Sequence, residues 1–182
     1  MLIRKKEPWS RFILKAAIGL AIVLPAIFYA TSRWEIGIDP QTETSILKKG
    51  GEAARVFLVD KRIEEEIAVG DILVIRIPQA AQDMMQSIGF TYPAATMAKR
   101  VAAMPGDHVL VDDRGVFVNG HQVASGLILA DMFASDRGRL HGETVVPANT
   151  LYLLGDASNS FDSRYWGVVS VTEVEGKASV IF

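Results

Sequence analysis

Two polar segments of this chain carry residue types that could do chemistry. The first runs from Gly155 to Gly167 and holds hydroxyls, two acids and an arginine. It lies between two apolar runs, residues 150–154 and 168–171, that are typical of strands. The second segment runs from Met97 to Asp107 and contains a lysine. Taken alone, the first segment is equally consistent with a capped turn in which Asp and Ser bond their own backbone.

Lys99 is a candidate general base if its surroundings keep it neutral. The reference pKa of a lysine is about 10.4, so an apolar, buried setting must lower this pKa by several units. Side chains alternate along a strand, so Met97, Val101 and Ala103 should lie on the same face as Lys99. Arg100 should point the other way, toward an acid. A neutral lysine can take the proton of a serine hydroxyl and return one to a leaving amine. The alternative is a surface lysine on an edge strand.

At these two segments the chain resembles the signal peptidase I family of membrane-bound serine/lysine proteases. Residues 99–101, followed by Pro105-Gly106-Asp107, are similar to the lysine box of that family. The family's final box is matched by Gly155-Asp156 with Ser160-x-Asp162-Ser163-Arg164-x-Trp166-Gly167. A weaker match, residues 69–75 before Pro78, resembles the strand box between the nucleophile and the lysine. The resemblance covers roughly residues 36–182.

The resemblance also implies supporting roles in the second half of the chain. Ser160 would hydrogen-bond the lysine and orient its amine. Asp162 and Arg164, two residues apart, could form a structural ion pair that holds the loop. Asp156 could meet Arg100. A buried pair of this kind orients groups more than it adds net stability.

The nucleophile is expected between the anchor and the strand box, within residues 36–47. Thr42, Thr44 and Ser45 are the candidates there, whereas Ser32 is too close to the membrane end. We choose Ser45, because the two residues after it resemble the family's Ser-hydrophobic-x pattern, with leucine where the family has proline. The resemblance implies the Ser45 backbone amide as one oxyanion donor, and Thr42 or Thr44 could supply the second. Otherwise Ser45 is a turn or helix-cap residue.

The N-terminal part is typical of a membrane anchor. Residues 12–30 are apolar except for Lys15, which can snorkel to the headgroups, and their length is close to the roughly 20 residues that cross a bilayer. The basic residues before this run predict a cytoplasmic N-terminus. We therefore expect a basic cytoplasmic N-terminus (residues 1–11), a transmembrane anchor (12–31) and a periplasmic catalytic β domain (32–182). A cleaved secretory signal ending near Ala30 is the alternative.

Composition argues against several other kinds of chemistry. The 182 residues carry a net charge of −2, so the chain offers no broad basic surface to nucleic acid. They include no cysteine, which excludes a cysteine nucleophile and any disulfide. His108, His121 and His141 are scattered and lack metal-ligand spacing. We expect no metal, no cofactor and no nucleic-acid partner.

Short β-branched runs dominate the chain after the anchor. Besides residues 150–154 and 168–171, we expect strands at 56–59, 72–77, 98–103, 108–111, 116–118 and 178–181. Turn residues at 112–115 and at Asn119-Gly120 suggest a meander around 116–118. Residues 79–92 interrupt this pattern as a short helix or a loop. We predict a mainly β protein, in which a single transmembrane helix precedes a compact antiparallel barrel- or sandwich-like signal peptidase domain. The resemblance implies the same fold, with its cleft facing the membrane.

Within the resembling family, the short chain and residues 56–61 and 160–165 are most similar to the TraF-type conjugative transfer peptidases. These process pilin for a type IV secretion pilus. The resemblance therefore implies a bacterial inner-membrane endopeptidase that acts on pro-pilin or on another signal-bearing preprotein in the lipid bilayer. A housekeeping preprotein signal peptidase is the alternative with the same chemistry. A non-catalytic, membrane-anchored pilus assembly factor is the alternative of another class.

Overall fold

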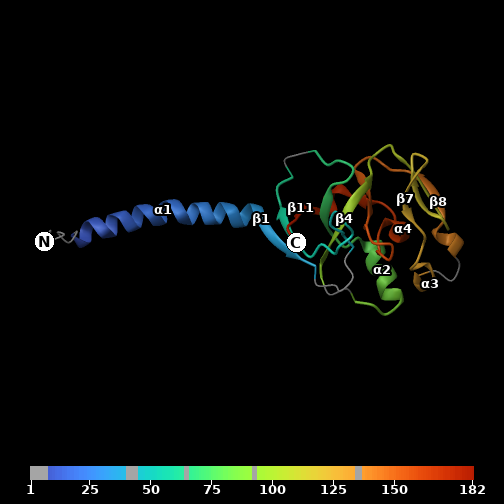
Figure 1. Ribbon diagram of the computed structural model, residues 1–182, viewed down its shortest axis with the longest axis horizontal. Coiled ribbons are helices and arrows are strands. Elements are labelled where there is room, and N and C mark those ends of the chain that lie inside the picture. The colour runs from blue at the N-terminus through green and yellow to red at the C-terminus, as the bar shows by residue number, and fades with distance from the viewer. Residues whose placement is uncertain (1–7, 40–44, 64–65, 92–93, 134–136) are drawn as a thin grey trace.

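A long helix leads into a mainly β domain in the computed structural model, which describes residues 8–39, 45–63, 66–91, 94–133 and 137–182. Helix α1 (Trp9–Arg33) projects from the domain as a rod (Figure 1). It is long and apolar enough to cross a membrane, and the rest of the described domain buries none of its residues. Its bounds are wider than the anchor expected at residues 12–31, and Pro25 lies inside it. The division of the chain at residues 11 and 31 stays a prediction.

The larger sheet holds seven antiparallel strands in the order β1-β2-β11-β3-β4-β9-β10. Their bounds are β1 Trp34–Ile38, β2 Val56–Asp60, β3 Ile72–Arg76, β4 Thr96–Ala103, β9 Thr150–Leu154, β10 Val169–Ser170 and β11 Val174–Val180. The C-terminal strand β11 lies between β2 and β3, so the two ends of the domain meet inside one sheet.

The smaller sheet has the order β7-β6-β5-β8. Its strands are β5 His108–Asp112, β6 Gly115–Val118, β7 His121–Ser125 and β8 Gly142–Val145. The expected meander is confirmed, because β6 pairs with β5 on one side and with β7 on the other. The turn between β6 and β7 has positive φ at Asn119 (50°) and Gly120 (81°), which is the conformation that Asn-Gly favours in tight hairpins.

One hydrophobic core joins the two sheets. Leu73, Ile75 and Val101 of the larger sheet belong to the same buried cluster as Val109 and Val116 of the smaller one. The prediction of a mainly β, antiparallel fold is confirmed. The prediction allowed a barrel-like or a sandwich-like domain. The structure is closer to the sandwich-like form, because neither strand order closes into a barrel within the described residues.

Helical segments are short outside α1. They are α2 (Gln79–Ser87), α3 (Ala130–Phe133), α4 (Ser163–Trp166) and the 3-10 turns η1 (Arg137–Leu140) and η2 (Val171–Glu173). The segment at residues 79–92 is thus helical over its first part, and α2 buries Ala81 and Met85. The strand expected at 168–171 is shorter, since Val171 already begins η2.

Candidate active site

Lys99, Ser45 and Ser160 meet at one point of the domain. Nζ of Lys99 lies 2.6 Å from Oγ of Ser45, which is 54 residues away in the sequence. The same Nζ donates to Oγ of Ser160 at 3.0 Å, and the two serine hydroxyls are 3.4 Å apart. Lys99 comes from β4, Ser45 from the segment after β1, and Ser160 from the loop after β9. The fold therefore assembles a hydroxyl, an amine and a second hydroxyl from three distant segments.

The position of Lys99 in β4 explains its burial. Side chains of β4 alternate between buried and half-buried, and Met97, Val101 and Ala103 share the buried face with the lysine, as expected from strand periodicity. Only 3% of Lys99 is exposed. Burial lowers the pKa of its amine from 10.5 to about 8, while the carboxylates of Asp162 and Asp39 act in the opposite direction. A substantial fraction of the amine is therefore neutral near physiological pH.

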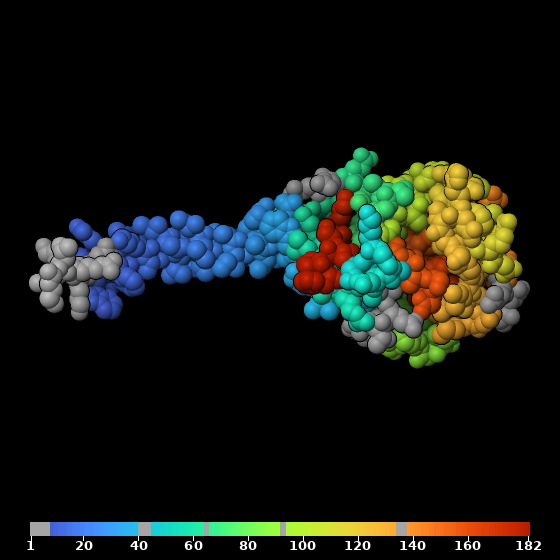
Figure 2. All heavy atoms as spheres, in the orientation of Figure 1, coloured from blue at the N-terminus to red at the C-terminus, as the bar shows by residue number. Residues whose placement is uncertain are grey.

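Backbone hydrogen bonds hold Ser45 against the loop after β9. The Ser45 carbonyl accepts from the N–H of Asp156 at 2.6 Å and from that of Ala157 at 3.3 Å. The next residue, Ile46, is 1% exposed and packs with Ala54 and Phe57. Ser45 is thus part of a bend that leads into a short antiparallel contact between Leu47 and Ala53, and it caps no helix. In Figure 2 this segment, coloured cyan, lies on the surface beside the red C-terminal strand.

Asp156 connects the Ser45 segment to the strand that carries the lysine. Its two carboxylate oxygens accept from Nε and Nη2 of Arg100 at 2.7 and 2.6 Å. One of them also accepts from the backbone N–H of Leu47 at 3.0 Å. Arg100 in turn donates to the carbonyl of Gly70 at 2.9 Å. The contact expected between Arg100 and Asp156 is present. The hydrogen bond from Leu47 to Asp156 is a further contact that the sequence did not reveal.

Asp162 and Arg164 form a buried ion pair inside the Ser160 loop. Asp162 is fully buried, Arg164 is 2% exposed, and their closest atoms are 2.7 Å apart. Asp162 also accepts from the backbone N–H of Gly155 at 2.9 Å and from that of Arg164 at 3.2 Å, which caps α4. The guanidinium donates to the carbonyls of Ala157, Ser158 and Ser160 at 3.3–3.4 Å. The pair therefore fixes the course of the backbone that presents Ser160.

Two residues that sequence reasoning did not single out also build this loop. The hydroxyl of Ser163 accepts from the backbone N–H of Leu153 at 3.0 Å, which ties the loop to β9. A Cβ at Gly155 would overlap the side chain of Ser160 and come within 3.0 Å of the Ser45 carbonyl. Both residues lie within the matched motif, so the motif was the signal that could have identified them.

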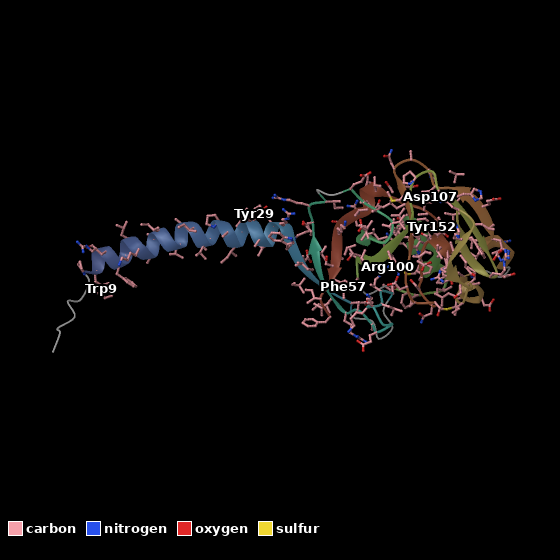
Figure 3. The ribbon with its side chains drawn as sticks, turned by 45° about the horizontal axis from the view of Figure 1, so that its top comes forward. Trp9, Tyr29, Phe57, Arg100, Asp107 and Tyr152 are labelled. Atoms are coloured by element: carbon pink, nitrogen blue, oxygen red, sulfur yellow. The ribbon has the colours of Figure 1, made fainter. Side chains whose placement is uncertain are left out.

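A small cavity of about 110 Å³ opens beside Ser45. Strands β1 to β4 and the segments next to them form its walls, and most of the wall residues are apolar or small. They are Gly37, Ile38, Asp39, Phe57, Val59, Val74, Ala94, Thr96, Met97 and Ala98. Figure 3 shows Phe57 and Arg100 in the part of the domain nearer to α1, with Asp107 and Tyr152 farther along the molecule. The cavity, which Phe57 lines, thus extends into the part of the domain nearer to α1.

Of the other hydroxyl candidates, Ser32 does not meet the lysine. Ser32 lies within α1, and its hydroxyl donates to the Tyr29 carbonyl at 2.8 Å. Thr42 and Thr44 lie outside the described residues. No group of three His, Asp or Glu side chains that could hold a metal ion occurs in the part of the chain that the structure describes.

Known proteins resemble this chain over parts of its length. It is 36% identical over 85 residues to a probable signal peptidase I-2 of Synechocystis (46% of this chain, 37% of that protein). It is 32% identical over 114 residues to a signal peptidase I of Leptolyngbya laminosa (62% of this chain, 51% of that protein). It is also 32% identical over 91 residues to the conjugal transfer protein TraF of Agrobacterium fabrum (48% of this chain, 49% of that protein). The aligned region spans about half or less of each relative.

A solved signal peptidase I from Enterococcus faecalis superimposes with a TM-score of 0.39 at 24% identity, over 65% of this chain and 98% of that one. The family model described as signal peptidase, peptidase S26, matches residues 11–182. Because this match takes in both polar segments, the Ser45 region and the whole β domain, the chain belongs to the signal peptidase family, peptidase S26.

Proposed function

We propose that this chain is a membrane-anchored serine endopeptidase in which Ser45 is the nucleophile and Lys99 the general base. The observation that carries the proposal is the buried amine of Lys99, 2.6 Å from the Ser45 hydroxyl, with a pKa of about 8. With this pKa roughly one amine in ten is neutral at pH 7, against about one in 3,000 for an ordinary lysine. The alternative of a non-catalytic assembly factor gives no reason to bury a lysine beside a hydroxyl.

The geometry supports an acyl-enzyme mechanism. Oγ of Ser45 attacks the peptide carbonyl carbon while Nζ of Lys99 takes the hydroxyl proton. The backbone N–H of Ser45, with Thr42 or Thr44 as the second donor, stabilises the oxyanion. The lysine then gives its proton to the leaving amine as the C–N bond breaks and an ester remains on Ser45. A water molecule attacks that ester, again with Nζ as the base, and the proton returns to Oγ.

Three other side chains position this pair. Ser160 accepts a hydrogen bond from Nζ at 3.0 Å and so orients the amine toward Ser45. The buried pair of Asp162 and Arg164 holds the Ser160 loop in place. Orientation of the base by a further group is the usual arrangement in such catalysts.

The surroundings of Ser45 support an extended peptide substrate with a small side chain next to the cleaved bond. Strand β9 pairs with β4 only from Arg100 onward, whereas β3 pairs with β4 from Thr96 to Arg100. Residues 96–99 therefore offer one unpaired edge in the described structure, to which an extended segment can add as a strand. The cavity beside Ser45, about 110 Å³, leaves room for a small side chain.

The apolar helix α1 supports a substrate held in the same membrane. With basic residues before the helix, the N-terminus would be cytoplasmic and the β domain periplasmic. The partners would be the lipid bilayer and a precursor whose cleavage site emerges at its outer surface. We place the protein in the bacterial inner membrane, as a single-pass protein.

We further propose that the precursor is a pro-pilin for a conjugative type IV secretion pilus. The similarity to two TraF proteins, of Agrobacterium fabrum and of Escherichia coli, favours this reading. Cleavage of ordinary signal-bearing preproteins is the alternative, favoured by the relatives named signal peptidase I. Purified protein offered both kinds of precursor in the same membrane should cleave the pro-pilin faster.

Replacing the two reacting groups tests the function itself. Ser45→Ala and Lys99→Met should each accumulate uncleaved precursor at normal protein levels, because no other group can form the ester or take its proton. Thr42→Ala and Thr44→Ala should each cost less than Ser45→Ala, with a loss of about 10²–10³-fold for the one that supplies an oxyanion donor. Normal processing by Ser45→Ala would disprove the assignment of the nucleophile. Normal processing by both Ser45→Ala and Lys99→Met would favour the assembly-factor alternative.

A further inference from the structure

Three aromatic rings form a cluster next to Ser160. Phe161 directly follows Ser160, and its ring stacks on Phe133 of α3, with ring centres 4.6 Å apart and planes inclined by 25°. The third ring is Tyr165 of α4, whose centre lies 5.8 Å from that of Phe161 and 5.9 Å from that of Phe133. These separations lie in the range of favourable aromatic pairs. We call Phe133, Phe161 and Tyr165 the aromatic cluster.

Phe133 reaches the aromatic cluster from a part of the chain outside the matched motifs. Helix α3 lies in the connection between β7 and β8 of the smaller sheet (Figure 1). The segment before Phe133 is anchored in the core, because Leu127 is 2% exposed and Ala130 is fully buried. The backbone N–H of Leu129 also donates to the Tyr165 hydroxyl at 3.1 Å. The cluster therefore ties the smaller sheet to the loop after β9.

The backbone of this loop is held more firmly after Phe161 than before it. Arg164 donates to the carbonyls of Ser160 and Ala157 at 3.4 and 3.3 Å, which are long for hydrogen bonds of this kind. The same guanidinium lies 2.7 Å from the carboxylate of Asp162, which is fully buried. Phe161 lies between these two parts of the loop, so its packed ring can fix the backbone where the hydrogen bonds are weaker.

The Ser160 hydroxyl has to stay in place for the amine of Lys99 to point at Ser45. Nζ of Lys99 lies 3.0 Å from Oγ of Ser160 and 2.6 Å from Oγ of Ser45. A misplacement of about 1 Å in a catalytic group can lower a rate about 10²-fold. Because Ser160 and Phe161 are neighbours in the chain, a shift of the Phe161 ring moves the backbone that carries this hydroxyl.

We propose that Phe133 is a positioning residue of the proposed peptidase. Through its stack on Phe161 it holds the Ser160 hydroxyl where Nζ of Lys99 can donate to it, and so it keeps the amine directed at Ser45. The connection between β7 and β8 thereby becomes part of the support of the catalytic pair. This inference rests on the proposed function, because it concerns the orientation of the proposed base.

Kinetics of the full chain in detergent micelles, with a signal-bearing precursor that the wild type cleaves, test this role. Phe133→Ala should lower kcat about tenfold and leave KM within about twofold, because the ring acts on the base and not on the substrate. Phe133→Tyr, which keeps the ring, should retain the wild-type kcat. Phe117→Ala is the matched control and should leave kcat unchanged, since Phe117 is a half-buried residue of β6 whose ring lies 4.9 Å from the guanidinium of Arg114.

Two further variants act on the same contact. Phe161→Ala removes the stack from the other side and should lower kcat to a similar extent. Phe133→Leu keeps most of the apolar volume without the stack, so it should lower kcat about threefold and keeps the test open if Phe133→Ala unfolds. An unchanged kcat in all the variants that remove the stack would overturn the proposal.

Ser160→Ala shows whether Phe133 acts through the serine. If it does, adding Phe133→Ala to Ser160→Ala should lower kcat by less than about twofold more, whereas two independent effects would multiply. A further loss of about tenfold in the double variant would overturn the proposal, because Phe133 would then act by another route.

A readout without catalysis separates this inference from the proposed function. The Nζ hydrogens of Lys99 can be observed by NMR of the full chain with isotope-labelled lysine and assigned with Lys99→Met. They should exchange with water about tenfold faster in Phe133→Ala than in the wild type, because the Ser160 hydroxyl no longer stays against the amine. Equal exchange would overturn the link from Phe133 to Lys99. If Ser45→Ala cleaves the precursor as fast as the wild type, the proposed function fails, while faster exchange in Phe133→Ala would still support this link.

Discussion

Replacing Lys99 with methionine should stabilise the protein at neutral pH while it removes the proposed base. Burial lowers the pKa of this amine from 10.5 to about 8. Each pKa unit corresponds to about 1.4 kcal/mol, so the protonated amine costs the fold about 3 kcal/mol. Methionine has a similar length and no charge. The hydroxyls of Ser45 and Ser160, 3.4 Å apart, can bond each other once the amine is gone.

The sign of the pH dependence follows from which state binds the proton more tightly. Between about pH 8 and pH 10.5 the unfolded chain holds the Lys99 proton and the folded chain does not. The unfolding free energy of the wild type therefore rises with pH across this window. Below pH 8 the cost of the buried charge is fully present, and above pH 10.5 it is gone. Relative to Lys99→Met, the wild type should gain about 3 kcal/mol between pH 7 and pH 10.5.

Thermal unfolding of the full chain in detergent measures this difference. For a chain of this size, about 3 kcal/mol corresponds to a shift in Tm of roughly 6–12 °C. The other groups that titrate in this range are shared by both proteins, so they cancel in the difference. Lys49→Met, at an exposed lysine, is the control and should show no such dependence. If the difference in unfolding free energy between wild type and Lys99→Met were constant from pH 7 to 10.5, the pKa of Lys99 would not be lowered. The proposed role of Lys99 as the general base would then lose its physical basis.

Three further outcomes are expected. The rate of precursor cleavage at limiting substrate should rise about tenfold per pH unit up to about pH 8 and then level off. Lys99→Arg should be inactive at every pH, because a guanidinium stays protonated. Activity of that variant would show that another residue is the base. Gly155→Ala should lower kcat by at least about tenfold, since its methyl group would displace Ser160 and the Ser45 carbonyl, and an unchanged kcat would show that the loop adapts freely. An alkaline phosphatase fused after Phe182 should be active in cells, and an inactive fusion beside an active cytoplasmic reporter would reverse the membrane orientation.

The strands for which sequence reasoning gave no residue range share one position in the fold. Strands β1, β7 and β8 each lie at the edge of a sheet, and all of their residues are at least partly exposed. Periodicity detects a strand through the face that it buries, and these strands bury little. Of the central strands, β3, β4 and β9 were placed to within two residues at each end, whereas β11 begins four residues before the strand expected at 178–181. An edge strand forms because its backbone pairs with the backbone of a neighbouring strand, and the local sequence does not show this pairing.

By itself the sequence determined the chemistry that is possible here and the local setting of each group. Strand periodicity placed Lys99 on a buried apolar face, with Arg100 on the other side. The apolar run predicted a helix long enough to span a bilayer, and the Asn-Gly turn predicted a hairpin. These features depend on residues that are close together along the chain, so a pattern of residue types is enough to reveal them.

Only the tertiary structure decided which hydroxyl the lysine meets. Ser45 reaches Lys99 because the loop after β9 binds the Ser45 carbonyl and because Asp156 holds both Leu47 and Arg100. The cavity beside Ser45 likewise combines side chains from β1, β2, β3 and β4. Such contacts join residues far apart in the sequence, from 54 positions between Ser45 and Lys99 to 109 between Leu47 and Asp156. They depend on strand order and register, which are set by packing of the whole domain and leave no periodic signal in the sequence.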